Sequence, residues 1–292
     1  MAAIAEASLS AAETRKPRAI WVAIRRNPTI FVGSLVLAVL ALMAIFAPLI
    51  AGDPLRMAPA ERLRPPSETW WFGTDQFGRD VFARTVYGAR VSLIVGITVA
   101  LAASAIGLVI GLVCGYSRSV DGIVMRIMDG IMAIPSILLA IALITLTRPG
   151  LAIVLVAIII PEVPRIVRLV RSVVLSIREQ PYIESAIAGG TRGAKLLFKH
   201  ILPNTVAPLI VQATYVCASA MLVEASLSFL GAGVPPEIPS WGNIISQGRS
   251  FFQIAPWSIL IPGAFLTVTI LAVNLVGDGL RDRLDPRLSR RM

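Results

Sequence analysis

Apolar residues run through the chain in long blocks, and clusters of charged residues separate these blocks. A helix needs about 20 apolar residues to cross the hydrocarbon core of a membrane. Five uncharged blocks reach or approach that length, namely residues 27–52, 91–117, 130–147, 201–223 and 250–277. We therefore predict a membrane-spanning helix at each of these places.

A sixth segment, residues 150–171, is apolar in its first half and charged in its second. Only 13 uncharged residues precede Glu162, which Arg165 and Arg168 follow at helical spacing. Glu162 and Arg165 can pair on one helix face, and long arginine side chains can reach the membrane surface. We count this segment as a span that other helices shield from lipid, with Glu162 and Arg165 at a pathway or interface.

Six spans place both ends of the chain on one side, and the basic residues indicate which side. Nineteen lysines and arginines fall on the side of the termini and eight on the other. Because basic loops are retained in the cytoplasm, both termini are predicted to be cytoplasmic. The predicted fold class is an all-α polytopic membrane protein with six transmembrane helices.

The predicted organisation follows from these spans. Its parts are a cytoplasmic tail at 1–28, a first span at 29–51, an outer loop with an amphipathic segment at 52–89, a five-span core at 90–277 containing a cytoplasmic elbow at 180–203, and a cytoplasmic tail at 278–292.

The composition agrees with a membrane protein. Of the 292 residues, 56% are hydrophobic and 15% are charged, whereas soluble domains carry about 25% charged residues. The net charge of +10 would suit a nucleic-acid partner, but the positive-inside rule accounts for it, so no nucleic acid is expected. Cys114 and Cys217 lie in apolar blocks and His200 is the only histidine, so neither a metal site nor a disulfide framework is expected.

Motifs for nucleotide binding and catalysis do not occur in the sequence. It contains no GxxxxGK followed by Ser or Thr, and no HExxH, GxSxG or GxGxxG pattern. Since each of these patterns supplies a phosphate cradle, metal ligands or a nucleophile, the chain is not expected to be an enzyme.

Other polar residues in the spans leave alternatives open. Glu224 falls near the outer end of the fifth span, where it either contacts headgroups or a loop or lines a pathway. Asp129 follows Arg126 by three residues, and a local ion pair is the favoured interpretation. Prolines that can kink helices lie in or at the ends of spans, at 135, 161, 164 and 262.

One basic, glycine-broken stretch separates the fourth and fifth spans: ESAIAGGTRGAKLLFKHILPN, residues 184–204. Residues 184–188 can form a short helix, with Glu184 favourable near its N-terminus. Glycines at 189, 190 and 193 permit a sharp turn. The sequence therefore predicts a helical elbow at the membrane face, and a plain linker is the alternative.

The second half of this stretch resumes a helix. Leu197, Phe198 and Ile201 are predicted to share one face of it, and Pro203 begins the next span at a position where proline is favoured. The length of the stretch favours an exposed knob over a plain linker.

A charged segment precedes the second span: WFGTDQFGRDVFARTVYGARVSL, residues 71–93. Its glycines allow tight turns, its charged residues can cap or pair, and Phe77, Val81 and Phe82 can touch the bilayer edge. A structural clamp beside the second span is favoured over a substrate site.

Both stretches carry a family resemblance. Residues 184–203 resemble the coupling motif of bacterial ABC-importer permeases, in which EAA, three residues and Gly precede nine residues and I-x-LP. The matching positions here are Glu184, Ser185, Ala186, Gly190, Leu202 and Pro203. The chain departs from this motif at two positions. Ser185 replaces the second motif residue, an alanine, and the isoleucine lies at 201, whereas His200 occupies the position at which the motif has isoleucine.

The outer segment resembles the dipeptide/oligopeptide permease subfamily, in the subunit that carries GTDxxGRD. The matching positions are Gly73, Thr74, Asp75, Gly78, Arg79, Asp80, Tyr87, Gly88, Ala89 and Arg90. EASLSFLGAGVPPEIPSWG, residues 224–242, resembles the fifth-span exit of the same subfamily. The likeness covers nearly the whole chain apart from the N-terminal tail.

This resemblance implies a type I ABC importer permease fold and a subunit of a binding-protein-dependent importer for peptides or similar small solutes, such as glutathione or nickel complexes. The implied partners are a second permease subunit, two cytoplasmic ATPase subunits that contact the elbow, an extracytoplasmic binding protein and the lipid bilayer of a bacterial inner membrane. The chain itself would hold no cofactor, since the ATPases bind ATP and Mg²⁺.

An ion-coupled secondary transporter that works without an ATPase is the alternative function. Such a protein needs ionisable residues near the membrane midplane, and Glu162 is the best candidate for that role. A membrane scaffold or receptor is a weaker third option.

Overall fold

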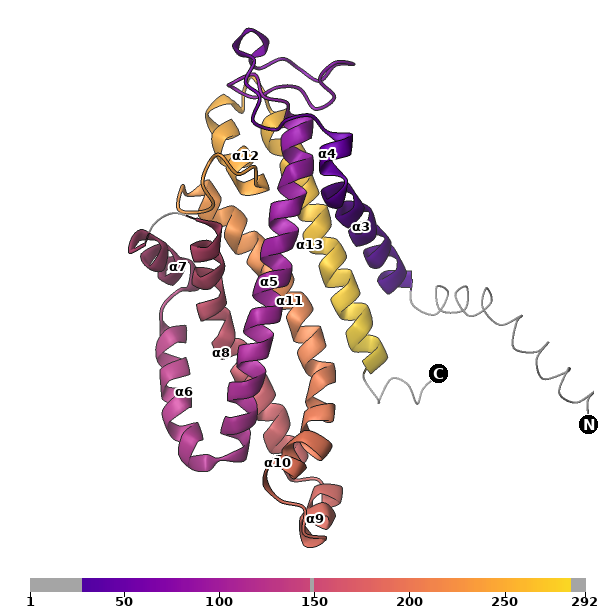
Figure 1. The fold of residues 1–292 in the computed structure, drawn as a ribbon, viewed down its shortest axis with the longest axis vertical. Coiled ribbons are helices and arrows are strands. Elements are labelled where there is room, and N and C mark those ends of the chain that lie inside the picture. Colours follow the sequence, from indigo (N-terminus) through magenta and orange to yellow (C-terminus); the bar gives the residue numbers. More distant parts are fainter. Residues whose placement is uncertain (1–27, 148–149, 285–292) are drawn as a thin grey trace, which may run out of the picture.

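The computed structural model describes residues 28–147 and 150–284, and every named element in these ranges is helical. Long helices run along the long axis of the molecule and short helices cap its two ends (Figure 1). The elements are α3 (Pro28–Ile45), α4 (Ala47–Ile50), η1 (Pro59–Glu61), α5 (Val81–Tyr116), α6 (Arg118–Ala133), α7 (Ser136–Thr145), α8 (Leu151–Arg178), α9 (Pro181–Ala188), α10 (Gly193–Leu196), the π-helical turn η2 (Leu197–Ile201), α11 (Leu202–Phe229), α12 (Trp241–Gly248), η3 (Arg249–Phe251) and α13 (Trp257–Leu284).

Four helices of the described residues are long and apolar enough to cross a membrane: α3, α5, the continuous stretch Gly193–Phe229 and α13. The bent pair of α6 and α7 makes a fifth candidate. The 28-residue α8 contains Glu162 and four arginines after it, so its composition alone does not mark it as a span. The chain runs up α3, down α5, up α6, down α8, up α11 and down α13, an alternation that six crossings require (Figure 1).

The third predicted span is broken at a proline. The axes of α6 and α7 differ by 87°. Pro135 lies at the break, has no N–H to donate, and holds Ile134 in an extended conformation with φ −92° and ψ 128°. The span predicted over 130–147 is therefore not one continuous helix, because α6 already ends at Ala133, but α6 and α7 together remain a candidate span.

The prolines of the fourth span do not interrupt their helix. Pro161 and Pro164 both lie inside α8, which continues to Arg178. At 1.5 Å per residue its 28 residues give a length of about 42 Å. One continuous helix therefore carries Glu162 in its middle and the arginines toward the end that leads into α9.

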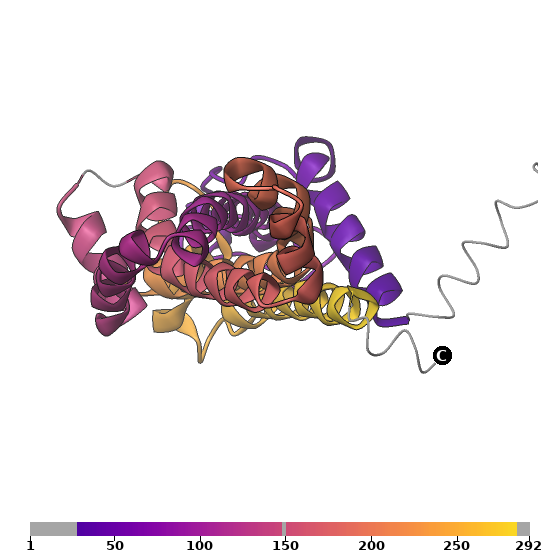
Figure 2. The same cartoon turned by 90° about the horizontal axis from the view of Figure 1, so that it is seen from below.

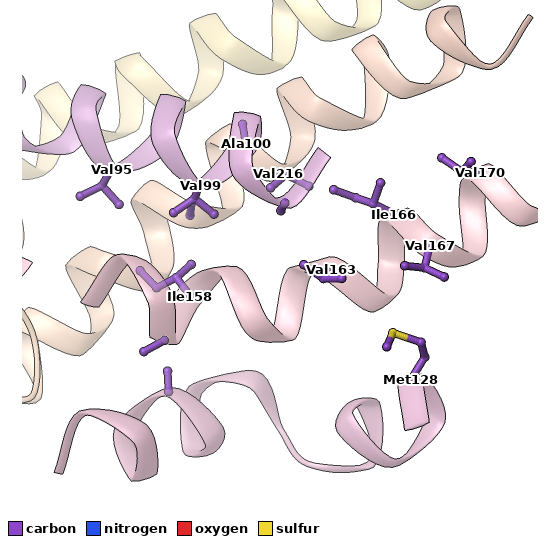
Figure 3. Packing of buried hydrophobic residues seen from close by; sticks show 14 of the residues in the cluster. Val95, Val99, Ala100, Met128, Ile158, Val163, Ile166, Val167, Val170 and Val216 are labelled. Carbon is purple, nitrogen blue, oxygen red and sulfur yellow. The ribbon is translucent and has the colours of Figure 1, made fainter. Parts of the chain in front are cut away.

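Glycines bring α5 and α8 into close contact. Gly107, Gly111 and Gly115 recur every fourth residue on α5, and a Cβ atom at any of them would lie 2.6–2.7 Å from a side chain of α8. The opposing residues are Ile166, Val170 and Val174. Small residues at this spacing let two helix backbones approach, and the resulting apolar core joins α5, α8 and α11 (Figure 3).

The two ends of the molecule differ in character. The elbow of α9 and α10 projects from one end, and the loops over 51–80 and 231–256 cover the other (Figure 1). Seen from below, α3 and α13 lie at one edge and α6 and α7 at the opposite edge (Figure 2). The predicted tail at 1–28, apart from Pro28, and the last eight residues of the predicted C-terminal tail lie outside the described residues.

Candidate functional site

The elbow between α8 and α11 consists of two short helices joined by glycines. Pro181 opens α9, where its missing N–H and fixed φ suit the first turn of a helix. The N–H of Thr191 donates to the carbonyl of Ala186 and that of Gly190 to the carbonyl of Ile187, each at 2.9 Å. These two bonds form a Schellman motif, which ends a helix at a residue in the left-handed conformation.

Gly190 supplies that left-handed residue. Its φ is +85°, and Gly193 at the start of α10 has a φ of +59°. A Cβ atom at Gly190 would meet nothing within 4 Å. The requirement for glycine at this position is therefore conformational rather than steric, and the predicted turn is confirmed.

The elbow exposes apolar and charged side chains in α9 and in the π-helical turn that follows α10. Tyr182 is 46% exposed and Phe198 67%, Glu184 and Ser185 are also exposed, and Ala186 is half-buried. The hydroxyl of Ser185 donates to the carbonyl of Pro181 at 2.9 Å. Large apolar side chains are normally covered in a soluble surface, so an exposed cluster of this kind is typical of a docking site.

The predicted apolar face of the second elbow helix is not observed. Ile201 is fully buried while Phe198 points outward, and Leu197 is half-buried. Residues 197–201 form a π-helical turn, whose wider winding rotates Phe198 and Ile201 to different sides. Leu202 and Pro203 then open α11, as the sequence predicted.

Contacts to α5 and α8 hold the elbow against the long helices. The hydroxyl of Tyr116, the last residue of α5, accepts the N–H of Gly193 at 3.1 Å. The guanidinium of Arg178, the last residue of α8, donates to the carbonyls of Gly115 at 2.8 Å and Tyr116 at 3.1 Å. Ile183 of α9 is fully buried. The elbow is thereby fixed to the C-terminal ends of α5 and α8.

Glu162 lies inside the bundle with an incomplete set of partners. Its side chain is 3% exposed and one oxygen, Oε1, accepts from the hydroxyl of Ser219 of α11 at 3.2 Å. Arg165, whose side chain is 50% exposed, stands 3.4 Å from the same oxygen. The predicted pair is thus present, but Oε2 has no hydrogen-bond partner in the described part of the chain.

Arginines farther along α8 pair with α6 rather than with near neighbours. Arg168 donates to Asp129 at 2.5 Å, and Arg171 contacts Asp121 through two nitrogens. The predicted local pair of Arg126 with Asp129 is therefore wrong, because the broken span brings α6 alongside the charged half of α8. These two ion pairs tie the two helices together.

The outer segment forms a buried ionic network. Asp75 Oδ2 accepts from Arg79 Nε at 2.7 Å and from an Arg84 guanidinium nitrogen at 2.6 Å, and all three side chains are at most 5% exposed. Gln247 of α12 accepts from both arginines. Burial of charged groups is costly unless they are paired and hydrogen-bonded, and the shared bonds of this network join the segment to α12.

Two glycines of the same segment permit close backbone approach. Gly73 has a φ of +73° and Gly78 of +72°, and a Cβ at Gly78 would lie 1.8 Å from the carbonyl oxygen of Ala58. Thr74 accepts the N–H of Arg64, and its own carbonyl accepts the indole N–H of Trp257 at 3.1 Å. The segment thus contacts its own loop and α13.

Asp80 caps α5 at its outer end. Its Oδ1 accepts the N–H of Phe82 at 2.9 Å, and burial raises the pKa of this carboxyl above its usual value. Phe82 packs edge-on against Trp71 and Phe72, and Val81 is fully buried. The predicted contact of Val81 with the bilayer edge is therefore wrong, because its side chain is fully buried within the protein.

Glu224 is fully buried in α11 near the outer loops. The hydroxyl of Ser228 donates to its Oε1 at 2.8 Å, Ser240 lies beside the carboxylate, and Oε2 has no partner among the described residues. A carboxylate in contact with lipid headgroups is therefore excluded. The other two interpretations, a loop contact and a pathway position, both agree with this location.

Several residues of these sites were not singled out in the sequence. Arg84 belongs to the outer network although it sits in the first turn of a long helix, and Gln247 joins it from 163 residues away. Ser219, Tyr116 and Arg178 likewise contribute through contacts between distant elements. Only Arg84, a charge bordering a span, had a signal in the sequence that could have marked it.

Together these features define a polytopic helical membrane protein with an exposed elbow at one end and a tightly bonded loop assembly at the other. The profile of a family described as "Binding-protein-dependent transport system inner membrane component" matches residues 107–290. A second profile, described as "N-terminal TM domain of oligopeptide transport permease C", matches residues 18–66.

Curated relatives match over nearly the whole chain. A probable peptide ABC transporter permease protein, y4tQ, of Sinorhizobium fredii is 58% identical over 267 residues, which cover 91% of this chain and 92% of that protein. The dipeptide transport system permease protein DppC of Alkalihalophilus pseudofirmus is 45% identical, covering 91% and 88%. The oligopeptide transport system permease protein OppC of Bacillus subtilis is 36% identical, covering 95% and 93%.

The chain belongs to the family of binding-protein-dependent transport system inner membrane components. It is a permease subunit of an ABC importer with the type I permease fold, and it is not itself an enzyme, since ATP hydrolysis falls to partner ATPases. A substrate-binding protein and ATPase subunits are its general partners. Nothing observed supports the ion-coupled alternative.

Proposed function

We propose that this permease subunit imports peptides, pairs with a second, different permease subunit, and is driven by two cytoplasmic ATPase subunits that grip the elbow. The peptide substrate class is supported by the names of the relatives, which refer to peptides, dipeptides and oligopeptides. An extracytoplasmic binding protein delivers the solute to the end covered by residues 51–80. ATP and Mg²⁺ bind to the ATPases, and this chain holds no cofactor.

The exposed elbow is the observation that carries this proposal. Its surface exposes the apolar Tyr182 and Phe198 as well as Glu184, a mixture that suits a cleft in a partner protein. Glu184, Ser185, Ala186, Gly190, Leu202 and Pro203 are the coupling residues in this proposal. Since Tyr116 and Arg178 join the elbow to α5 and α8, a movement of the tip would carry these helices with it.

The orientation in the membrane follows from the charge distribution. Nineteen basic residues lie on the side of the termini and eight on the other. We place both termini in the cytoplasm of a bacterial cell and the protein in its inner membrane. The elbow, with Lys195 and Lys199, then faces the cytoplasm, where ATPases are available.

The outer segment serves as a clamp in this proposal. Asp75, Arg79 and Asp80 are engaged with protein groups, and Gly73, Thr74 and Gly78 shape the backbone around them. These residues hold α5, α12 and α13 together and do not contact substrate. Glu162, Arg165 and Glu224 are assigned to the pathway or to a subunit interface.

Reconstitution of the complex in vesicles tests the proposal. The permease is assembled with its partner permease, the ATPases and a loaded binding protein, and peptide uptake and ATP hydrolysis are measured. We expect both activities to require the ATPases, and Glu184→Lys to abolish both while leaving insertion in the membrane unchanged. Uptake by the permease subunits without ATPases would contradict the proposal and support an ion-coupled transporter.

A further inference from the structure

One side of α11 carries a stripe of residues that the neighbouring helices cover only in part. Gln212, Tyr215, Ser219, Leu222 and Ser226 recur at alternating intervals of three and four residues. At 3.6 residues per turn they fall within an arc of about 80°. All five side chains are partly or fully exposed, although the surrounding α11 sequence is that of a membrane span.

The stripe lies between two other helices. Tyr215 bonds to Asp278 of α13, and Ser219 bonds to Glu162 of α8. The opposite side of α11, with Cys217 and Met221, packs on Gly96 of α5. The stripe is therefore a strip of open surface flanked by α8 and α13 and turned away from α5.

Each hydroxyl group of the stripe donates its proton to another group of the protein. Tyr215 donates its proton to Asp278, Ser219 donates to Glu162, and Ser226 donates to the carbonyl of Leu222. A hydroxyl has one proton and two lone pairs. Because each proton is already engaged within the protein, the oxygen atoms of Ser219 and Ser226 are left as hydrogen-bond acceptors, whereas Arg281 of α13 already lies against the Tyr215 oxygen.

This surface is unsuited to lipid. Polar groups that face hydrocarbon are unfavourable, and polar residues within spans usually line a bundle interior or a water-filled path. The amide of Gln212 has no hydrogen-bond partner within the described part of the chain, and it lines a cavity of 480 Å³ at the inner end of the stripe. Tyr215 and Arg281 line the same cavity, so the polar surface continues toward the inner end of α13.

We infer that this stripe is the wall of the translocation pathway and acts as a row of hydrogen-bond acceptors for the N–H groups of a passing peptide. The inference rests on the proposed function, and it deepens that function by naming the surface and the chemistry that the solute meets. A peptide carries regularly spaced N–H donors and an ammonium end, which acceptor oxygens match. Glu162 is a positioning residue, because it holds the proton of Ser219 inward.

Cysteine accessibility tests the location of the stripe. Ser219→Cys and Ser226→Cys are made in a background lacking Cys114 and Cys217, and the assembled complex is treated with a charged, membrane-impermeant thiol reagent. Val39→Cys of α3 and Val109→Cys of α5, whose native side chains are 57% and 63% exposed, serve as controls on other faces. We expect only the two stripe positions to react, loaded binding protein to slow the reaction, and modification to block uptake.

Two results would overturn the location. If the stripe cysteines do not react while unmodified complexes import peptide, the stripe packs against protein and the pathway lies elsewhere. If the controls react as fast as the stripe cysteines, the reagent does not distinguish a pathway from lipid-facing surface, and the assignment falls. A wild-type complex that imports no peptide would instead contradict the proposed function.

A change of solute tests the chemistry. A depsipeptide replaces a peptide N–H with an ester oxygen and so removes one donor. With the same binding protein in every assay, we expect Ser219→Val to lower the preference for peptide over depsipeptide by a factor on the order of ten, and Ser219→Thr to preserve it. An unchanged preference in Ser219→Val would show that the acceptor oxygen does not meet the solute N–H.

Discussion

The hydroxyl of Tyr116 accepts the backbone N–H of Gly193 at 3.1 Å, which joins the inner end of α5 to the second helix of the elbow. The same residue lies 5.7 Å below the guanidinium of Arg178, which in turn donates to the carbonyl of Tyr116. Two long helices and the elbow therefore meet at one aromatic side chain. This junction is a direct route by which movement of the elbow can reach α5.

Removal of the Tyr116 hydroxyl should weaken the junction without disturbing the ring. We expect Tyr116→Phe to leave the N–H of Gly193 unpaired at a local cost of about 1 kcal/mol. The complex should still assemble, but ATP hydrolysis stimulated by loaded binding protein should fall several-fold. Tyr87→Phe at the outer end of α5 is the matched control, and equal effects of the two variants would argue against a role for the junction.

The left-handed turn at Gly190 gives a second prediction. Alanine at this position has open space but must adopt a φ of +85°, which costs about 1–2 kcal/mol for a residue with a side chain. We expect Gly190→Ala to reduce ATPase binding and peptide uptake, and Gly190→Asp to do so more strongly.

Its neighbour offers a control that separates conformation from side-chain size. Gly189 has a φ of −72° and a Cβ there would lie in ordinary contact at 3.4 Å. Gly189→Ala should therefore keep near-normal uptake and ATPase capture in a pull-down. If both alanine variants behave alike, the turn is not what limits coupling.

Cysteine labelling from outside the cell tests the orientation. Ser67 and Ser250 are both exposed in the loops at the outer end, and we expect cysteines placed there to react with an impermeant reagent in intact cells. Ser240 is a poor site for such a probe, because it is fully buried at the start of α12. A cysteine at Ser289 should react only after the membrane is opened, and labelling of Ser289→Cys in intact cells would reverse the proposed topology.

The parts of this molecule that sequence reasoning predicted depend on local rules. Long apolar blocks predict spanning helices because the hydrocarbon core has a fixed thickness, and the glycine at 190 predicts a turn because only glycine enters that conformation freely. Pro135 was recognised as a helix breaker, but not as the residue that ends α6 and turns the chain by 87°. A proline can bend or end a helix, and the outcome depends on how its neighbours pack.

The features that sequence reasoning missed depend on which helices are neighbours and on which of their faces are in contact. Asp129 was assigned to Arg126 on its own helix, but it pairs with Arg168 of α8, 39 residues away. Gln247 completes a network with Arg84 across 163 residues. Helical spacing gives the face on which a side chain lies, but the rotation of one helix against another is set by packing such as the fit of α5 glycines onto α8.

The buried network around Asp75 gives the last prediction. Its Oδ2 is the shared partner of Arg79 and Arg84, and all three side chains are almost completely buried. Loss of one member of a buried ion pair leaves an uncompensated charge, and here two arginines would remain, so we expect Asp75→Asn to destabilise the folded subunit by about 3 kcal/mol. Thermal unfolding in detergent and the yield of assembled complex measure this loss.

Glu61→Gln is the matched control. It removes the ion pair of Glu61 with Arg64, whose side chains are 41% and 59% exposed, and such exposed pairs contribute about 0–1 kcal/mol. Equal stability of the two variants would mean that Gln247 and the backbone N–H groups hold the outer segment without the charge on Asp75.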